Sequence, residues 1–135
     1  MEYNIRNFTV DEALDIIYRD PSQLSLEEMH RVALTYPAGS DEFKEVFEIA
    51  VRMYPDDPVS NLNAANIALQ NRQADKARRY LAKAAPSAQK ELAEAILLML
   101  DERWADAETA LSRLTSQPEV SEAATANLEL VKLMR

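Results

Sequence analysis

The sequence predicts an all-α protein in which about eight helices pair antiparallel and stack as a solenoid. The chain of 135 residues has one glycine and is rich in Ala, Leu, Glu, Lys and Arg, most of which lose little side-chain freedom in a helix. Apolar residues recur at helical spacing between capping residues and prolines. Small residues return at the same places after thirty residues, which is typical of stacked repeats.

Each of the first three helices has a capping residue at its start and a proline after its end. Thr9 with Glu12, and Ser25 with Glu28, have the spacing of capping boxes. Ser40 is a single cap for the third helix. We therefore expect an extended arm or linker over residues 1–9, followed by three helices that stop before Pro21, Pro37 and Pro55.

Five further helices are expected in the rest of the chain. Asp57 and Pro58 supply a cap and a first-turn proline for a helix that ends near Asn71. The next helix stops before Pro86. The last three are predicted over residues 87–100, 104–115 and 119–134.

A shift of thirty residues places small residues on small ones and large residues on large ones. Small side chains allow two helix axes to approach closely, so recurring alanines are expected where helices cross. The matched pairs are Ala65 with Ala95, Ala77 with Ala107, and Leu81 with Leu111.

On these residues the chain resembles the tetratricopeptide repeat (TPR) family, whose units pair a helix A with a helix B. Ala65, Ala77 and Ala84 stand at the family's small positions. Leu81 stands at its large helix B position, and Pro55 at the proline between units. The resemblance covers residues 24 to 114.

The resemblance implies a right-handed α-α superhelix over residues 10–135, which would form one TPR-like domain. The implied units are about 24–57, 58–86 and 87–116, with end helices at 10–19 and 119–134.

The chain departs from the family in the turns between helices A and B, where the family usually has glycine. Asn71-Arg72 and Asp101-Glu102 occupy these turns. Because asparagine tolerates a positive φ, we expect Asn71 to take the place of glycine in the first of them.

The family's concave surface is lined by helix A side chains, and most matching positions here are apolar. An apolar groove of this length should hold a partner segment or part of the chain itself, such as its first or last helix. The candidate partner-binding residues are Leu34, Leu62, Asn63, Asn66, Leu69, Gln70, Leu92, Ile96 and Met99.

Asn63 coincides with a position that carboxylate-gripping members of the family use to hold a peptide terminus. The rest of that clamp is missing, and a structural role is favoured for Asn63 and for its neighbours Asn61 and Asn66. The clamp's other places are occupied by Leu62, Gln89 and Ala93.

We expect no catalytic site, metal site or cofactor. His30 is the single imidazole, so any Ser-His-Asp or histidine metal site would have to include it, and a partly exposed helical side chain explains it better. The lack of cysteine excludes thiol catalysis and cysteine zinc sites. One glycine cannot build a phosphate-binding loop or a calcium loop.

The charge distribution disfavours nucleic acid and membrane partners. Residues 1–57 hold 13 acidic and 5 basic side chains, whereas residues 58–135 hold 10 of each. An acidic surface repels phosphate backbones and anionic lipid. The longest apolar run, residues 95–100, is too short to span a membrane.

A narrower resemblance concerns NFTVDEALDII, LSLEEM and VFEIAVRMYPDDPVSNLNAANIAL, which are similar to carboxy-terminal segments of Bacteroidales cell-envelope proteins with an OmpA-like module. It implies that the chain is part of a larger protein of the cell envelope or periplasm.

We therefore expect a noncatalytic protein-protein interaction module that binds an apolar peptide or helix in a concave groove. Leu62, Asn66, Leu69, Leu92 and Ile96 are the principal contacts expected. The alternative is a structural spacer or a dimerisation element whose groove is self-covered, and a homodimer stays open. An enzyme is the third hypothesis.

Overall fold

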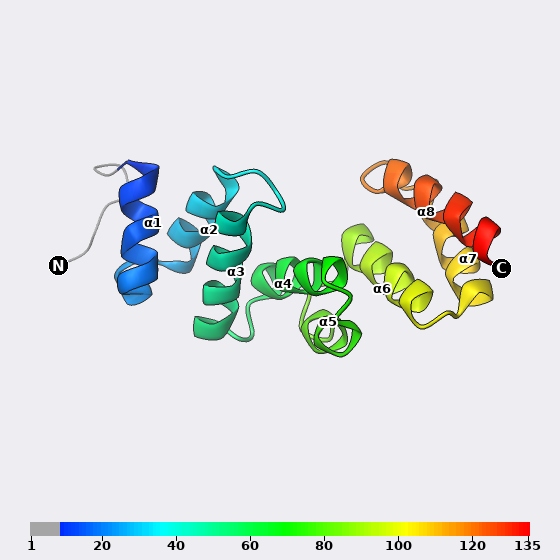
Figure 1. The fold of residues 1–135 in the computed structure, drawn as a ribbon, viewed down its shortest axis with the longest axis horizontal. Coiled ribbons are helices and arrows are strands. Elements are labelled where there is room, and N and C mark those ends of the chain that lie inside the picture. The colour runs from blue at the N-terminus through cyan, green and yellow to red at the C-terminus, as the bar shows by residue number, and fades with distance from the viewer. Residues whose placement is uncertain (1–8) are drawn as a thin grey trace. The chain divides into compact units, whose positions relative to one another are not determined.

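The computed structural model describes residues 9–135, which form eight α-helices and one short 3-10 turn, with no strand among them (Figure 1). The all-α prediction is confirmed. Of the expected arm, residues 1–8 lie outside the described residues. The helices are α1 (Val10–Arg19), α2 (Leu26–Leu34), α3 (Asp41–Met53), α4 (Pro58–Gln70), α5 (Ala74–Leu81), α6 (Ala88–Leu100), α7 (Trp104–Leu114) and α8 (Ser121–Met134), and the 3-10 turn is η2 (Pro21–Gln23).

The predicted caps of α1, α2 and α3 are confirmed. The hydroxyls of Thr9 and Ser25 accept the N–H groups of Glu12 and Glu28, each at 3.1 Å, and the two glutamates accept the N–H groups of their caps in return. Ser40 caps α3 through its hydroxyl. These helices therefore begin where contacts three residues apart satisfy their first N–H groups.

The chain divides into two compact units, Met1–Ser60 and Asn61–Arg135, which we call the N-terminal unit and the C-terminal unit. The boundary falls within the first turn of α4. The expectation of one domain over residues 10–135 stays a prediction.

In the N-terminal unit, α2 and α3 form a helical hairpin and α1 packs with it around an apolar core. Phe47 is almost fully buried at the centre, and the ring of Phe43 meets it edge-on with 4.8 Å between ring centroids. The core consists of Ala13, Ile16, Ile17, Leu24, Met29, Val32, Ala33, Val46, Phe47, Ala50 and Val51.

Two tyrosine hydroxyls tie α1 to this hairpin. The Tyr18 hydroxyl donates to the carboxylate of Glu45 on α3, and the Tyr36 hydroxyl, just beyond α2, donates to Asp11 on α1 at 3.2 Å. Burial, together with the neighbouring carboxylates, raises the pKa of both tyrosines. A tyrosine hydroxyl is protonated at neutral pH, and the raised pKa keeps both of these hydroxyls as hydrogen-bond donors in more alkaline solution.

The C-terminal unit has two buried clusters, and α6 contributes to both. Ala93 belongs to the first cluster and Ala95 to the second, so opposite sides of α6 are covered. The first cluster contains Ala65, Ala68, Leu69, Ala77, Leu81 and Ala93. The second contains Ala95, Ala107, Leu111, Leu114, Val120, Ala124 and Val131. The four alanines expected at helix crossings are thus all buried.

The turns after α4 and α6 have the same backbone geometry, thirty residues apart. Arg72 has a φ of 57° and Glu102 a φ of 60°. The N–H of Gln73 bonds to the C=O of Ala68 at 2.8 Å, and that of Arg72 bonds to the C=O of Leu69 at 3.0 Å, which together form a Schellman motif. The equivalent hydrogen bonds after α6 join Arg103 to Leu98 and Glu102 to Met99.

The prediction that Asn71 replaces the glycine of the first turn is wrong. The N–H of Asn71 still bonds to the C=O of Ile67 at 3.1 Å, so the residue continues the helical hydrogen bonding. The left-handed residue is the next one, Arg72. The Schellman motif requires a left-handed conformation at the position after the C-cap, whatever residue stands there.

Glycine at either left-handed position should stabilise the protein. Arg72→Gly and Glu102→Gly are each expected to raise the free energy of unfolding by about 1 kcal/mol, because a residue with a Cβ is strained at positive φ. Asn71→Gly is the matched control and should not stabilise, since Asn71 has no such strain. Urea unfolding followed by circular dichroism measures all three. Equal stabilisation by Asn71→Gly would contradict this explanation.

Candidate interaction site

A pocket of about 350 Å³ lies in the C-terminal unit, and we call it the α4–α8 pocket. Its volume is at the lower end of the range for pockets that bind small ligands or single side chains. Its lining is mostly apolar. The lining residues are Leu69, Gln70, Arg72, Ile96, Met99, Leu100, Trp104, Leu130 and Met134.

Helical spacing explains why these side chains meet. On α6, Ile96 is followed by Met99 and Leu100, three and four positions later, so all three lie on one face. On α8, Leu130 and Met134 are four positions apart. Leu130 is 47% exposed and Met134 is 56% exposed, so α8 forms a wall that solvent still reaches.

The structure brings together four of the nine predicted partner-binding residues. Leu69 and Gln70 come from the last turn of α4, and Ile96 and Met99 come from α6. Leu69 is largely buried and also belongs to the first cluster, whereas Gln70 is exposed. The assignment of these residues to partner binding stays a prediction.

The other five predicted residues do not line this pocket. Leu62 packs against the first buried cluster and Leu92 against the second, so both contribute to the core of the unit. Asn63 and Asn66 are half-buried on α4. Leu34 ends α2 in the N-terminal unit and is 69% exposed.

Sequence reasoning missed five lining residues: Arg72, Leu100, Trp104, Leu130 and Met134. A signal for part of this set is present in α8. Its buried residues include Ala124 and Val131, and Leu130 and Leu133 lie off that buried stripe. Apolar side chains beside a complete core stripe indicate a second contact surface.

His30, the single imidazole, lies close to both a serine and an aspartate. Its Nε2 is 2.9 Å from Oγ of Ser60 and 3.6 Å from Oδ2 of Asp57, while its ring packs 5.3 Å from that of Phe47. Burial lowers the pKa of His30, against a smaller opposing effect of the Asp57 carboxylate. The ring is therefore neutral at neutral pH and hydrogen-bonds to Ser60.

This arrangement differs from a Ser-His-Asp triad. In a triad the hydroxyl and the carboxylate bind opposite ring nitrogens, whereas here both lie nearest Nε2. Asp57 instead accepts the N–H of Ser60 at 2.7 Å, as predicted for the cap of α4, and Ser60 is fully buried. The His30–Ser60 hydrogen bond thus joins α2 to the first turn of α4.

Asn61 follows this cap and is also buried, at 1% exposed. Within residues 9–135, no buried side-chain nitrogen or oxygen lacks a hydrogen-bond partner. The amide of Asn61 is therefore satisfied within the fold, which supports the structural interpretation of this asparagine.

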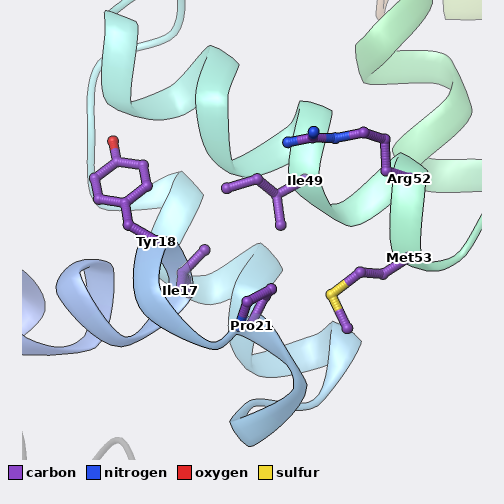
Figure 2. A pocket seen from close by; sticks show the side chains of 6 residues that line it. All are labelled: Ile17, Tyr18, Pro21, Ile49, Arg52 and Met53. Atoms are coloured by element: carbon purple, nitrogen blue, oxygen red, sulfur yellow. The ribbon is translucent and has the colours of Figure 1, made fainter.

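A second pocket, of about 320 Å³, lies in the N-terminal unit, and we call it the α1–α3 pocket. Figure 2 shows the side chains of Ile17 and Ile49 around a common space, with Pro21 and Met53 on one side of it. The guanidinium of Arg52 extends alongside Ile49. Tyr18 also lines this pocket. None of the nine predicted partner-binding residues does.

Neither a metal-binding group nor a membrane-spanning helix is found in the described part of the chain. Residues 9–135 contain no group of three or more His, Cys, Asp or Glu side chains placed to hold a metal ion. Among the helices of the same residues, none has the length and apolar character needed to cross a membrane.

Comparison with known proteins finds no matching family model, no matching curated protein and no matching solved structure. Any proposal of function therefore rests on the sequence and on the geometry of residues 9–135.

Proposed function

We propose that the chain is a noncatalytic protein-interaction module and that the α4–α8 pocket receives apolar side chains of a partner peptide or helix. One observation carries this proposal: a mostly apolar pocket of about 350 Å³ is open to solvent beside the exposed side chains of Leu130 and Met134. Exposure of such apolar surface to water is unfavourable in free energy, and surface of this kind is typical of sites that bind apolar segments.

We further propose that the helices belong to a TPR-like right-handed superhelix. The support is the pair of Schellman turns with left-handed residues thirty positions apart, Arg72 and Glu102. The sharing of α6 between two buried clusters adds to it, since a stacked repeat covers both sides of its inner helices. A place in a larger cell-envelope protein is a proposal that comes from the resemblance alone.

The noncatalytic part of the proposal is supported by the geometry around His30. Ser60 and Asp57 share one ring nitrogen, and Ser60 is buried. His30 lines neither the α4–α8 pocket nor the α1–α3 pocket.

A dimerisation element is the alternative, and one feature of α8 favours it. Leu133 is 82% exposed and lies beside Leu130 and Met134 at the end of the helix. A second copy that covers these side chains would remove apolar surface from water. Light scattering distinguishes the two proposals, since a dimer that Leu133→Asp converts to a monomer would favour the alternative.

Selection of peptides on the immobilised full chain tests the proposed function. A phage-displayed library of random peptides should yield binders with large apolar residues. Titration with these peptides should change the fluorescence of Trp104, which lines the pocket and is the single tryptophan of the chain. Leu130→Asp and Met134→Asp should each weaken binding by about tenfold or more, since each removes apolar contact area.

Leu133→Asp is the matched control, because Leu133 lies on the same helix, is more exposed and does not line the pocket. It should change the affinity less than about twofold. Circular dichroism checks that all variants keep their helices. Failure to enrich any peptide would overturn the proposed function. So would the finding that Leu130→Asp and Met134→Asp bind the peptides as tightly as the wild-type protein does.

A further inference from the structure

Arginines are paired with acidic side chains through most of this protein. Of the nine arginines within residues 9–135, six form ion pairs with Asp or Glu. Within the same part of the chain, no ion pair or side-chain hydrogen bond involves Arg52, Arg72 or Arg79. All three arginines are exposed; Arg52 and Arg72 each line a pocket, and Arg79 lines neither of these two. Both pockets thus hold a guanidinium with unused hydrogen-bond donors.

Arg72 has the stronger setting for a ligand. It is the charged residue among the nine that line the α4–α8 pocket, and most of the others are apolar. Arg72 itself is exposed, but apolar walls beside it lower the dielectric on the pocket side, which strengthens its interaction with a carboxylate that enters there. Arginine is also suited to hold a carboxylate through two parallel hydrogen bonds.

The net charge of the N-terminal unit opposes an anionic ligand at its pocket, whereas the C-terminal unit has no net charge to oppose one. The N-terminal unit holds 13 acidic and 5 basic side chains, so its field repels anions from Arg52 and the α1–α3 pocket. The C-terminal unit holds 10 of each and has no net charge. The C-terminal unit itself therefore adds no net repulsion to an acidic segment that approaches Arg72.

We propose that the α4–α8 pocket selects segments of partner proteins in which an Asp or Glu side chain lies within about one helical turn of a large apolar side chain. The apolar side chain enters between Ile96 and Leu130, and the carboxylate accepts hydrogen bonds from Arg72. This inference rests on the proposed function and adds the acidic residue to the description of the partner.

The test uses the same peptide selection on the full chain, followed by amidated synthetic peptides that have no terminal carboxylate. Selected peptides should be enriched in Asp or Glu near the apolar anchor relative to the unselected library. Arg72→Gln should weaken the binding of an acidic peptide by about five- to tenfold, the effect of losing one charged hydrogen-bond pair. Arg79→Gln, which removes an unpaired arginine outside the pocket, should leave the affinity unchanged.

A double-mutant cycle isolates the contact. Replacing the acidic residue of the peptide by its amide should reduce the binding free energy as much as Arg72→Gln does. The two changes together should reduce it little more than either one alone. Raising the ionic strength should weaken binding to the wild-type protein more than to Arg72→Gln. Two results would overturn this inference. One is the selection of peptides without an acidic residue that bind the wild-type protein and Arg72→Gln with equal affinity. The other is binding that requires a free terminal carboxylate on the peptide. The proposed function would then still stand if binding depends on Leu130 and Met134.

Discussion

Replacement of Leu111 by alanine is expected to lower the free energy of unfolding of the C-terminal unit by about 3 kcal/mol. Leu111 lies on α7 and is fully buried in the second cluster, to which α6, α7 and α8 contribute. Truncation removes apolar contacts and leaves a cavity that the surrounding helices fill only in part, and such changes cost about 2 to 5 kcal/mol. The fluorescence of Trp104 during urea unfolding measures the loss, because this tryptophan lies in the same unit.

Ser112→Ala is the control for Leu111→Ala. Ser112 is the next residue of α7 and is exposed, so its truncation should change the free energy of unfolding by less than about 0.5 kcal/mol. A loss below about 1 kcal/mol for Leu111→Ala would contradict the assignment of Leu111 to the core.

Replacement of Ala107 by leucine is expected to lower the free energy of unfolding by about 1 to 3 kcal/mol. Ala77→Leu, at the equivalent position thirty residues earlier, should have the same effect. Both alanines are fully buried, each in one of the two clusters of the C-terminal unit. A leucine at a close helix contact forces the helices apart or drives side chains from their preferred rotamers. Urea unfolding of each variant provides the measurement.

The matched control is Ala105→Leu, on the same helix as Ala107 but exposed. Alanine and leucine have similar helix propensities, so this variant should be nearly neutral. If Ala77→Leu and Ala107→Leu were also neutral, the explanation of the recurring alanines as close helix contacts would be wrong.

Sequence reasoning succeeded where a local contact decides the structure. The capping boxes of α1 and α2 were predicted because each depends on two residues three positions apart. Prolines were less accurate guides to helix ends: α5 ends at Leu81, well before Pro86, and α2 ends at Leu34, before Pro37. A proline limits how far a helix can extend, and the helix ends earlier where packing no longer supports its last turn.

The left-handed turn residue shows a second kind of limit. Asparagine has the better intrinsic tolerance of positive φ, which is why Asn71 was expected there. The register of α4 places the left-handed position at Arg72, and the hydrogen bonds of the Schellman motif outweigh the propensity of one side chain. Glu102 takes the same conformation after α6, so the geometry is repeated although the residue type is not.

By itself, the sequence determined the helices and the recurring alanines that the structure buries. Caps act over three residues, and the alanine spacing is visible along the chain, so these features need no knowledge of distant contacts. The tertiary structure alone decided the α4–α8 pocket. Leu69 and Met134 are far apart in sequence, and the packing of α6 with its neighbours α5, α7 and α8 brings the end of α8 to the end of α4. Helical periodicity states which face of a helix is apolar, but the crossing geometry of the helices determines which faces meet and where a space is left between them.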